Sequence, residues 1–239
     1  LTSARKISPF ISDYELDVSQ FADSPEKFET FNDFFSRKLK DSSRPILGAD
    51  NELTFPADGR HIMVSDLSKE QAIWAKGQSF NLKKLLGSSE RADRYQFGSV
   101  LISRLCPTDY HRFHFPCNGT ASASELIDGH LYSVNPIALM KNISYLWQNK
   151  RSVTELDSEI FGKVCLLDVG ATCVGCIMQT YEEGLVDKGQ EKGYFRFGGS
   201  MTMVFLEPGR VTYSEDLIEQ SQNGTELYAV MGDVCAKAS

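Results

Sequence analysis

The stretch FRFGGSMTMVFL, residues 195–206, joins a Gly-Gly-Ser turn to an unbroken apolar run. A short run of this kind, rich in Val, Phe and Met and introduced by glycines, is typical of a fully buried β-strand. Ser200 therefore stands where a turn enters a strand. Because Gly198 and Gly199 carry no side chains, the Gly199 carbonyl is uncrowded and the backbone there can adopt strained angles. The electrophile nearest to the Ser200 hydroxyl is thus its own preceding peptide bond.

Short β-type runs of the same kind follow one another after about residue 50. They are GSVLISRL (98–105), KVCLLDV (163–169), TCVGCIMQT (172–180), RVTYS (210–214) and ELYAVM (226–231), with SFNLKKLLG (79–87) and PIALMKNISYL (136–146) as helix candidates between them. This texture predicts an α+β fold, with a mostly antiparallel β body and a few peripheral helices. The related turns FPADGR (55–60) and FPCNGT (115–120), and the likeness of AKGQSF (75–80) to DKGQEK (187–192), predict duplicated β-hairpin-like units.

The N-terminal part of the chain has a different character. DSPEKFETFNDFFSRKLKDSSRPI (23–46) predicts one or two short helices, with Ser24 or Thr30 as a cap and Pro25 in a first turn. Its apolar residues at helical spacing are Phe28, Phe31, Phe34, Phe35 and Leu39. We expect this aromatic face to pack on the body, with a lipid or partner contact as the alternative. Residues 1–45 are expected to form a helical segment, and residues 46–239 a β-rich domain that carries the chemistry.

Composition limits the classes of partner. The chain has 239 residues and a net charge of −7, from 25 Lys and Arg against 32 Asp and Glu, and no basic run stands out, which argues against nucleic acid. No run of 18 apolar residues is present, so we expect no spanning helix, although apolar side chains can still contact a membrane surface. Six cysteines without a dense framework favour reduced thiols and a reducing compartment. The chain begins at Leu1 without a signal-peptide pattern, so we expect its natural start to lie upstream.

CPTDYHRFHFPCNG (106–119) contains two of the four histidines, His111 and His114. The aromatic, proline-bounded context favours an extended segment, in which these two rings point to opposite faces and do different jobs. Two core histidines with a purely structural role are the alternative, and this spacing alone is poor evidence for zinc. Cys173 and Cys176 form a CxxC with no second pair, and we interpret them as small core residues. We expect no metal.

Asp58 lies at the tip of the FPADGR turn, where an aspartate is expected for structural reasons. Combined with a histidine and a serine, it is a candidate for an orienting carboxylate. Imidazole, with a pKa of about 6.5, can accept a serine proton near neutral pH, and a carboxylate can hold the ring and stabilise its charged form. Ser200 lacks the GxSxG elbow and opens a strand, so a hydrolase is not favoured.

These motifs, in this order, resemble the phosphatidylserine decarboxylase proenzymes, the short bacterial type in particular. The resemblance runs through FNDFFSRKLKDSSRPI, FPADGR, KGQSFNLKKLLG, CPTDYHRFHFPCNG, HLYSVNP, DVGATCVG and KGQEKGYFRFGGS, nearly all of residues 28–215. It implies that Asp58, His114 and Ser200 form a charge relay for self-cleavage between Gly199 and Ser200. The products would be a β chain, 1–199, and an α chain, 200–239, whose Ser200 has become a pyruvoyl group, the only cofactor implied.

The resemblance also implies that the pyruvoyl group forms a Schiff base with phosphatidylserine and that the product is phosphatidylethanolamine. The enzyme would be peripheral, at the cytoplasmic face of the cell membrane, with lipid access through residues 28–35, and a homodimer is left open. His111 is our candidate proton donor in decarboxylation, or a contact to the substrate carboxylate. Two departures are Met201, where the family more often has a small polar residue, and Gly-Gly-Ser in place of Leu-Gly-Ser. The alternatives are a pyruvoyl-dependent decarboxylase of a soluble amino acid and an uncleaved, non-catalytic lipid-binding homologue.

Overall fold

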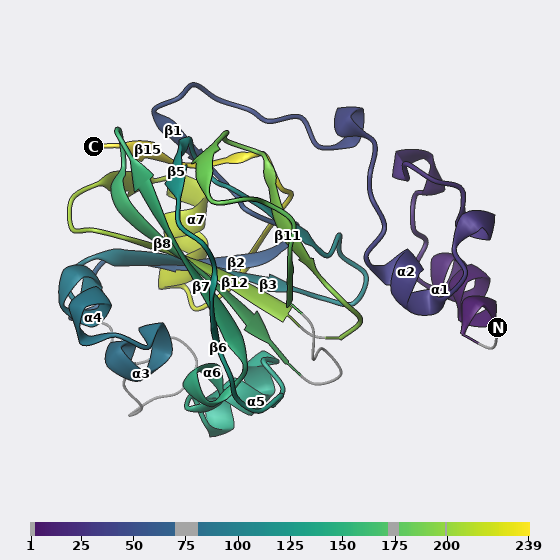
Figure 1. Ribbon diagram of the computed structural model, residues 1–239, viewed down its shortest axis with the longest axis horizontal. Helices are drawn as coiled ribbons and strands as arrows, with labels where there is room; N and C mark the ends of the chain where they lie inside the picture. Colours follow the sequence, from purple (N-terminus) through teal and green to yellow (C-terminus); the bar gives the residue numbers. More distant parts are fainter. Residues whose placement is uncertain (1–2, 70–80, 172–176, 199) are drawn as a thin grey trace.

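The computed structural model describes residues 3–69, 81–171, 177–198 and 200–239 (Figure 1). Three features of the sequence fall outside these ranges: the AKGQSF segment, the CxxC cysteines Cys173 and Cys176, and Gly199 itself. The predictions made for them therefore stay predictions.

A sheet of nine strands forms the body, and every pairing in it is antiparallel. Its order is β10 (Gly184–Val186), β5 (Gly119–Ala121), β7 (Arg151–Ser158), β8 (Gly162–Gly170), β12 (Ser200–Leu206), β3 (Ser99–Leu105), β2 (Gly59–Val64) and β14 (Leu227–Ala229), with β6 (Glu125–Ile127) also paired to β7. The α+β prediction is confirmed.

Two three-stranded sheets complete the β structure. One joins β1 (Glu52–Thr54), β15 (Val234–Ala238) and β13 (Val211–Tyr213). The other joins β4 (Arg112–His114), β11 (Glu191–Phe195) and β9 (Ile177–Gln179). The second sheet matters for function, because β4 ends at His114 and β11 leads into the Gly-Gly-Ser turn.

Strand β12 lies inside the body and is buried on both faces. Its side chains alternate as a strand requires. Met201, Met203 and Phe205 belong to one apolar cluster, and Val204 and Leu206 belong to another. Burial on both faces is the reason why the sequence of this strand is continuously apolar and not alternating.

Helices cover both faces of the central sheet. The first cluster is shared with α3 (Leu82–Leu86), α4 (Ser89–Tyr95), α5 (Pro136–Lys141) and α6 (Tyr145–Gln148), which gather along one side of the body in Figure 1. The second cluster includes Leu217 of α7 (Glu215–Gln222). The helix expected in 79–87 is present as α3, with Asn81 as its cap, and the one expected in 136–146 is divided into α5 and α6.

The N-terminal segment lies to one side of the body in Figure 1. It contains η1 (Ala4–Lys6), α1 (Ile7–Asp13), η2 (Val18–Gln20), η3 (Pro25–Lys27), α2 (Phe31–Phe35) and η4 (Asp41–Ser43). Thr30 caps α2, as the sequence predicted, and the structure adds Asp33, which completes a capping box. Phe31, Phe34 and Phe35 are buried in a small core of this segment. The aromatic face is therefore packed inside the protein and not turned to solvent.

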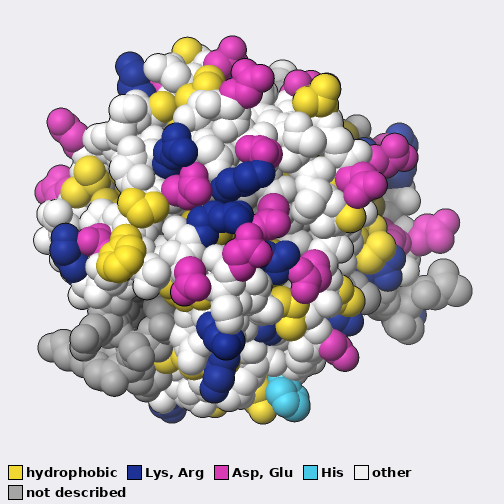
Figure 2. Space-filling view, turned by 60° about the vertical axis from the view of Figure 1, so that its left-hand side comes forward, with side chains coloured by type: hydrophobic (Ala, Val, Ile, Leu, Met, Phe, Trp, Pro, Cys, Tyr) yellow, Lys and Arg dark blue, Asp and Glu magenta, His cyan; other side chains and the backbone are white. Residues whose placement is uncertain are grey.

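Within the described ranges, no helix combines the length and the apolar character that crossing a bilayer needs. On the face shown in Figure 2, basic and acidic side chains are interspersed. That face offers no broad basic surface to a polyanion.

Candidate active site

Ser200 is the first residue of β12 and pairs with Leu105 of β3 on one side and Gly170 of β8 on the other. Its side chain is fully buried, and its Oγ has no hydrogen-bond partner. Two residues further along the same face, Thr202 donates to Oδ1 of Asp168 at 3.2 Å, and Oδ2 of Asp168 accepts from Lys192 of β11. Because alternate residues share a face, Ser200 points to the side of the sheet where β4, β11 and β9 lie.

Asp58 immediately precedes β2, the strand on the far side of β3. Gly59 has a φ of +149°, and a Cβ there would lie 2.5 Å from the Arg104 carbonyl oxygen, so the turn requires glycine. Since Arg60 pairs with Arg104, the turn is level with Leu105 and hence with Ser200. Two strands that are separated by one intervening strand lie about 10 Å apart. We therefore expect about this distance between the backbones at Asp58 and Ser200.

The Asp58 carboxylate is buried and bound by an arginine. Arg44 donates from Nε to Oδ1 at 2.9 Å and from Nη2 to Oδ2 at 2.5 Å, and the Met231 N–H donates to Oδ1 at 2.9 Å. Arg44 has no signal of a site residue in the sequence, because only the tertiary fold brings its partner to it.

His114 ends β4 and is held close to the aspartate turn, since its N–H donates to the Pro56 carbonyl at 2.7 Å. Its Nδ1 is buried without a hydrogen-bond partner, and the ring borders a cavity of about 290 Å³ that Arg44 and Tyr110 also line. Burial lowers the pKa of His114 to about 4, against the opposing charges of Glu191 and Asp58. The ring is therefore neutral at pH 7 and able to accept a proton.

A small apolar cluster brings these positions together. It contains Ala57, Leu105, Phe113 and Phe195. Ala57 precedes Asp58, Phe113 precedes His114, and Leu105 is the strand partner of Ser200. The predicted trio thus gathers at one end of the central sheet. Among the described residues, the side chains of the trio make no hydrogen bond to one another, so their joint role stays a prediction.

His111 has surroundings unlike those of His114. Its ring is fully buried against Phe35, with ring centroids 3.9 Å apart. Its Nδ1 lies 2.8 Å from the Asp109 carbonyl. Because a carbonyl only accepts, Nδ1 carries the proton, and Nε2, which has no partner, is left as an acceptor. Burial lowers the pKa of His111 to about 3, so the ring is neutral at pH 7.

A second cavity, of about 210 Å³, adjoins the backbone neighbours of Ser200. It is lined by Leu105, which pairs with Ser200, and by Ala171, which follows its other partner, Gly170. Ser133 and Asn135 of the HLYSVNP motif line this cavity and also an adjoining depression of about 320 Å³ beside α5. Over the described parts of the chain, His, Cys, Asp and Glu side chains form no group of three or more suited to holding a metal ion.

Fold and site together define an α+β protein with a candidate serine nucleophile buried at the start of its central strand. Comparison with known proteins identifies the family. The family model for phosphatidylserine decarboxylase matches residues 31–236. A phosphatidylserine decarboxylase proenzyme of Clostridium tetani is 44% identical over 236 residues, which are 98% of this chain and 80% of that protein. Proenzymes of the same name from Clostridium perfringens and Clostridium novyi are each 44% identical, over 97% of this chain and 79% of their own length. The chain belongs to the phosphatidylserine decarboxylase family, as its ordered motifs predicted.

Proposed function

We propose that this chain is a phosphatidylserine decarboxylase proenzyme that cuts itself between Gly199 and Ser200 and so makes its own pyruvoyl group. The observation that carries the proposal is the pair of buried polar atoms without partners, Oγ of Ser200 and Nδ1 of His114, at one end of the sheet. A buried polar group left without a hydrogen bond costs about 1–3 kcal/mol. Buried groups without a hydrogen bond are rare in native proteins and need an explanation. A serine and a histidine that are kept free to react with the scissile peptide bond would explain both of them. Membership of the family supports the same conclusion.

In the proposed cleavage, neutral His114 accepts the proton of the Ser200 hydroxyl. The oxygen attacks the carbonyl carbon of Gly199, the C–N bond breaks, and the chain becomes an ester with a free amine at residue 200. Loss of the Cα proton and breakage of the Cβ–O bond then release residues 1–199 with a carboxylate end. The dehydroalanine left on residues 200–239 takes up water and loses ammonia, which yields the pyruvoyl end.

Asp58 takes part through its charge. Burial lowers the pKa of His114, and the negative charge of Asp58 partly offsets that effect. The same charge therefore stabilises the imidazolium that forms when His114 accepts the proton. Arg44 binds the carboxylate through charge-assisted hydrogen bonds of 2.5–2.9 Å and so holds it in place.

The pyruvoyl group fits the position of Ser200, because the buried Oγ has no other partner and a cavity of about 210 Å³ is lined by the strand partner Leu105 and by Ala171, which follows the other partner. Its carbonyl would supply an electron sink as carbon dioxide leaves. Nε2 of His111 is an acceptor at neutral pH, so we assign it uptake of a proton from the substrate ammonium group and return of that proton to the product. In this proposal the substrate amine binds at the end of that cavity nearest the start of β12, where Leu105 lines it.

We place the membrane at the outer end of the same cavities, with the protein peripheral on the cytoplasmic face. Ile137 and Met140 of α5 are 64% and 51% exposed, and Leu131 and Tyr132 are each 37% exposed. We call these four residues the α5 patch. Ile137 lines the depression that adjoins the cavity of about 210 Å³, and Met140 and Tyr132 each precede a residue that lines it. If the acyl chains of the substrate stay in a bilayer that contacts this patch, its headgroup can enter the depression and the adjoining cavity. Residues 28–35 are the range expected from the sequence to give lipid access, but three of its four phenylalanines, Phe31, Phe34 and Phe35, are buried.

The proposed function is tested by intact mass. The purified protein is expected as two chains, residues 1–199 and residues 200–239, the latter with a pyruvoyl end, whereas a Ser200→Ala protein stays as one 26.7 kDa chain. The two-chain protein should release carbon dioxide from phosphatidylserine and not from free serine. A wild-type chain that stays whole with an unmodified Ser200 contradicts the proposal, and faster release from free serine favours the soluble amino acid as substrate.

The α5 patch is tested by substitution with a polar, uncharged residue. Ile137→Ser/Met140→Ser is expected to weaken binding to phosphatidylcholine–phosphatidylserine vesicles by more than tenfold, since burial of each side chain contributes about 1.5–3 kcal/mol. Cosedimentation measures the binding. Leu185→Ser is the matched control, because Leu185 is 88% exposed but lies on β10, at the edge of the sheet. Equal binding by the α5 variant and this control would place the membrane contact elsewhere.

A further inference from the structure

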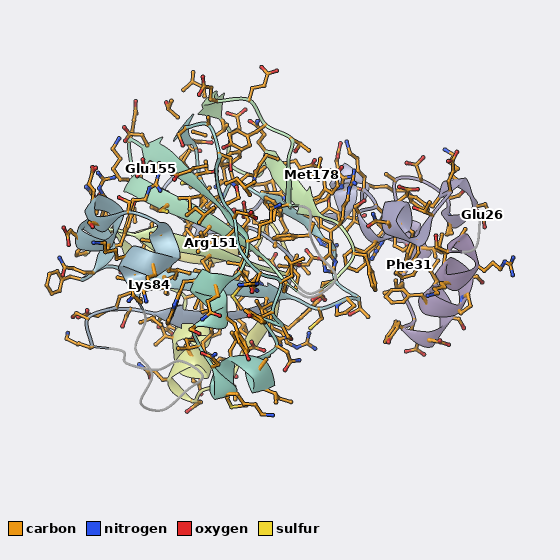
Figure 3. The ribbon with its side chains drawn as sticks, turned by 60° about the horizontal axis from the view of Figure 1, so that its bottom comes forward. Glu26, Phe31, Lys84, Arg151, Glu155 and Met178 are labelled. Carbon is orange, nitrogen blue, oxygen red and sulfur yellow. The ribbon has the colours of Figure 1, made fainter. Side chains whose placement is uncertain are left out.

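The N-terminal segment contacts the chain immediately before the proposed scission site. Oδ1 of Asn32 accepts a hydrogen bond from the Phe197 N–H at 2.9 Å. The rings of Phe31 and Phe35 meet the Phe197 ring edge-on, with centroids 5.3 and 5.0 Å away. In Figure 3, Phe31 lies on the side of the segment that faces the body, and Glu26 lies on its outer side. Helix α2 therefore holds a residue three positions before Ser200.

The contacted stretch is a short connection between two sheets. It leaves β11 at Phe195 and enters β12 at Ser200. Phe197 is 39% exposed, so the body encloses its ring only in part, and Gly198 has a φ of +140°, which favours glycine. The backbone N–H of Phe197 has a side chain of α2 as its partner. The course of the chain into the scission site therefore depends on α2.

Helix α2 is itself fixed to the strand that carries the proposed base. Arg112 of β4 donates to the Ser36 carbonyl at 2.7 and 3.0 Å, just beyond α2, and its Nη1 pairs with Glu191 of β11 at 2.8 Å. Phe35 packs on the His111 ring with centroids 3.9 Å apart. The same short helix thus links the β4 strand, which ends at His114, to the segment that ends at Ser200.

We infer that α2 is a clamp for self-cleavage, in which Asn32, Phe31 and Phe35 are positioning residues that hold Phe197 and so align the scissile bond with Ser200 and His114. The inference rests on the proposed self-cleavage. An attack within one chain depends on near-attack geometry, and a displacement of about 1 Å can slow such a step by about a hundredfold. The clamp touches neither the nucleophile nor the base, so it changes the rate of cleavage without changing the pKa of the base.

Cleavage rates of matched variants test the clamp. Newly translated Asn32→Leu, which keeps the size of the side chain but loses the acceptor, should cleave about tenfold more slowly than wild type. Asn32→Asp keeps an acceptor oxygen and should cleave within about twofold of wild type. Lys38→Ala, an exposed position on the same segment, should cleave at the wild-type rate. The pH at which the rate halves should be the same for all four proteins. Asn32→Leu cleaving as fast as wild type overturns the inference.

A second measurement does not need cleavage to occur. In an uncleavable Ser200→Ala protein, trypsin can cut after Arg196, which is exposed and adjacent to Phe197. Adding Asn32→Leu should raise the rate at which the fragment ending at Arg196 appears by about tenfold, because the clamp no longer holds the neighbouring backbone. An unchanged tryptic rate overturns the clamp even if wild type cleaves itself. A wild-type chain that stays whole overturns the proposed function, while the tryptic rates still test the clamp.

Discussion

A His114→Gln protein is expected to stay as a single 26.7 kDa chain on the timescale over which wild type divides in two. Glutamine keeps polar atoms in the place of the ring but cannot accept the serine proton, and loss of a general base costs about 10²–10⁴ in rate. Denaturing gel bands timed after translation, followed by intact mass, measure the effect. Cleavage by His114→Gln within tenfold of wild type would show that another group takes the proton.

The pH dependence follows from the burial of His114. Burial lowers its pKa to about 4, so the ring is neutral and active above that pH and protonated below it. The cleavage rate of wild type should therefore be nearly constant from about pH 8 to pH 5 and fall about tenfold per unit below pH 4. Because the folded pKa is below the usual value of about 6.5, the stability contribution of this neutral histidine also declines as pH falls from 6.5 to 4. Circular dichroism at each pH separates unfolding from loss of reaction.

Two other histidines provide controls. His61→Gln alters a fully buried histidine in β2, whose Nδ1 lies 2.8 Å from Ser103 Oγ, and this protein should cleave like wild type. His111→Gln should also divide into two chains, because its Nε2 is assigned to decarboxylation, but it should then release carbon dioxide at least tenfold more slowly. A His111→Gln protein that performs both steps at wild-type rates contradicts the role given to that ring.

The parts of the fold that could be predicted are those in which local pattern and burial agree. Strand β12 is enclosed on both faces, so its sequence is continuously apolar, and α3 has a capping Asn81 and a left-handed Gly87 at its end. Strand β7 was missed because several of its buried residues are polar. Arg151, for example, is buried by donating to the carbonyls of Lys84 and Leu85, a region shown in Figure 3. The hydrogen-bond partners of these buried polar side chains lie far away in the sequence, so the local sequence pattern does not predict the strand.

Some residues of the candidate site could be predicted from local motifs, and others could not. Asp58, His114 and Ser200 lie in short motifs whose residue types suggest chemistry, and the fold gathers them at one end of a sheet. Arg44 lies in the expected N-terminal segment and is not a candidate site residue from the sequence, yet it binds Asp58 with hydrogen bonds of 2.5–3.0 Å. The contact of Asn32 with Phe197 spans 165 positions. Neither contact has a sequence signal, because both depend on the path of the N-terminal segment around the body.

The largest loss of stability is expected from Lys192→Met. Lys192 and Asp168 are almost completely buried, with Nζ 2.5 Å from Oδ2, and the same carboxylate accepts from Gln179 and Thr202. Removing the ammonium leaves a buried carboxylate without its counter-charge, which costs about 3–5 kcal/mol of unfolding free energy. Urea unfolding, followed by tryptophan fluorescence, should show a correspondingly lower midpoint.

Two controls test whether the loss of stability comes from the unpaired buried charge and not from a nonspecific effect of the substitution. One is a double variant, and the other breaks an exposed ion pair. Asp168→Leu/Lys192→Met removes both charges and should recover much of the lost stability, because apolar residues of similar volume can replace a buried pair. Lys163→Met breaks a pair of the same 2.5 Å length, with Asp157, but its side chains are 45% and 58% exposed, so a change below about 1 kcal/mol is expected. If Lys192→Met and Lys163→Met lower the midpoint equally, the buried pair is not what stabilises the packing of β11 and β9 against β8.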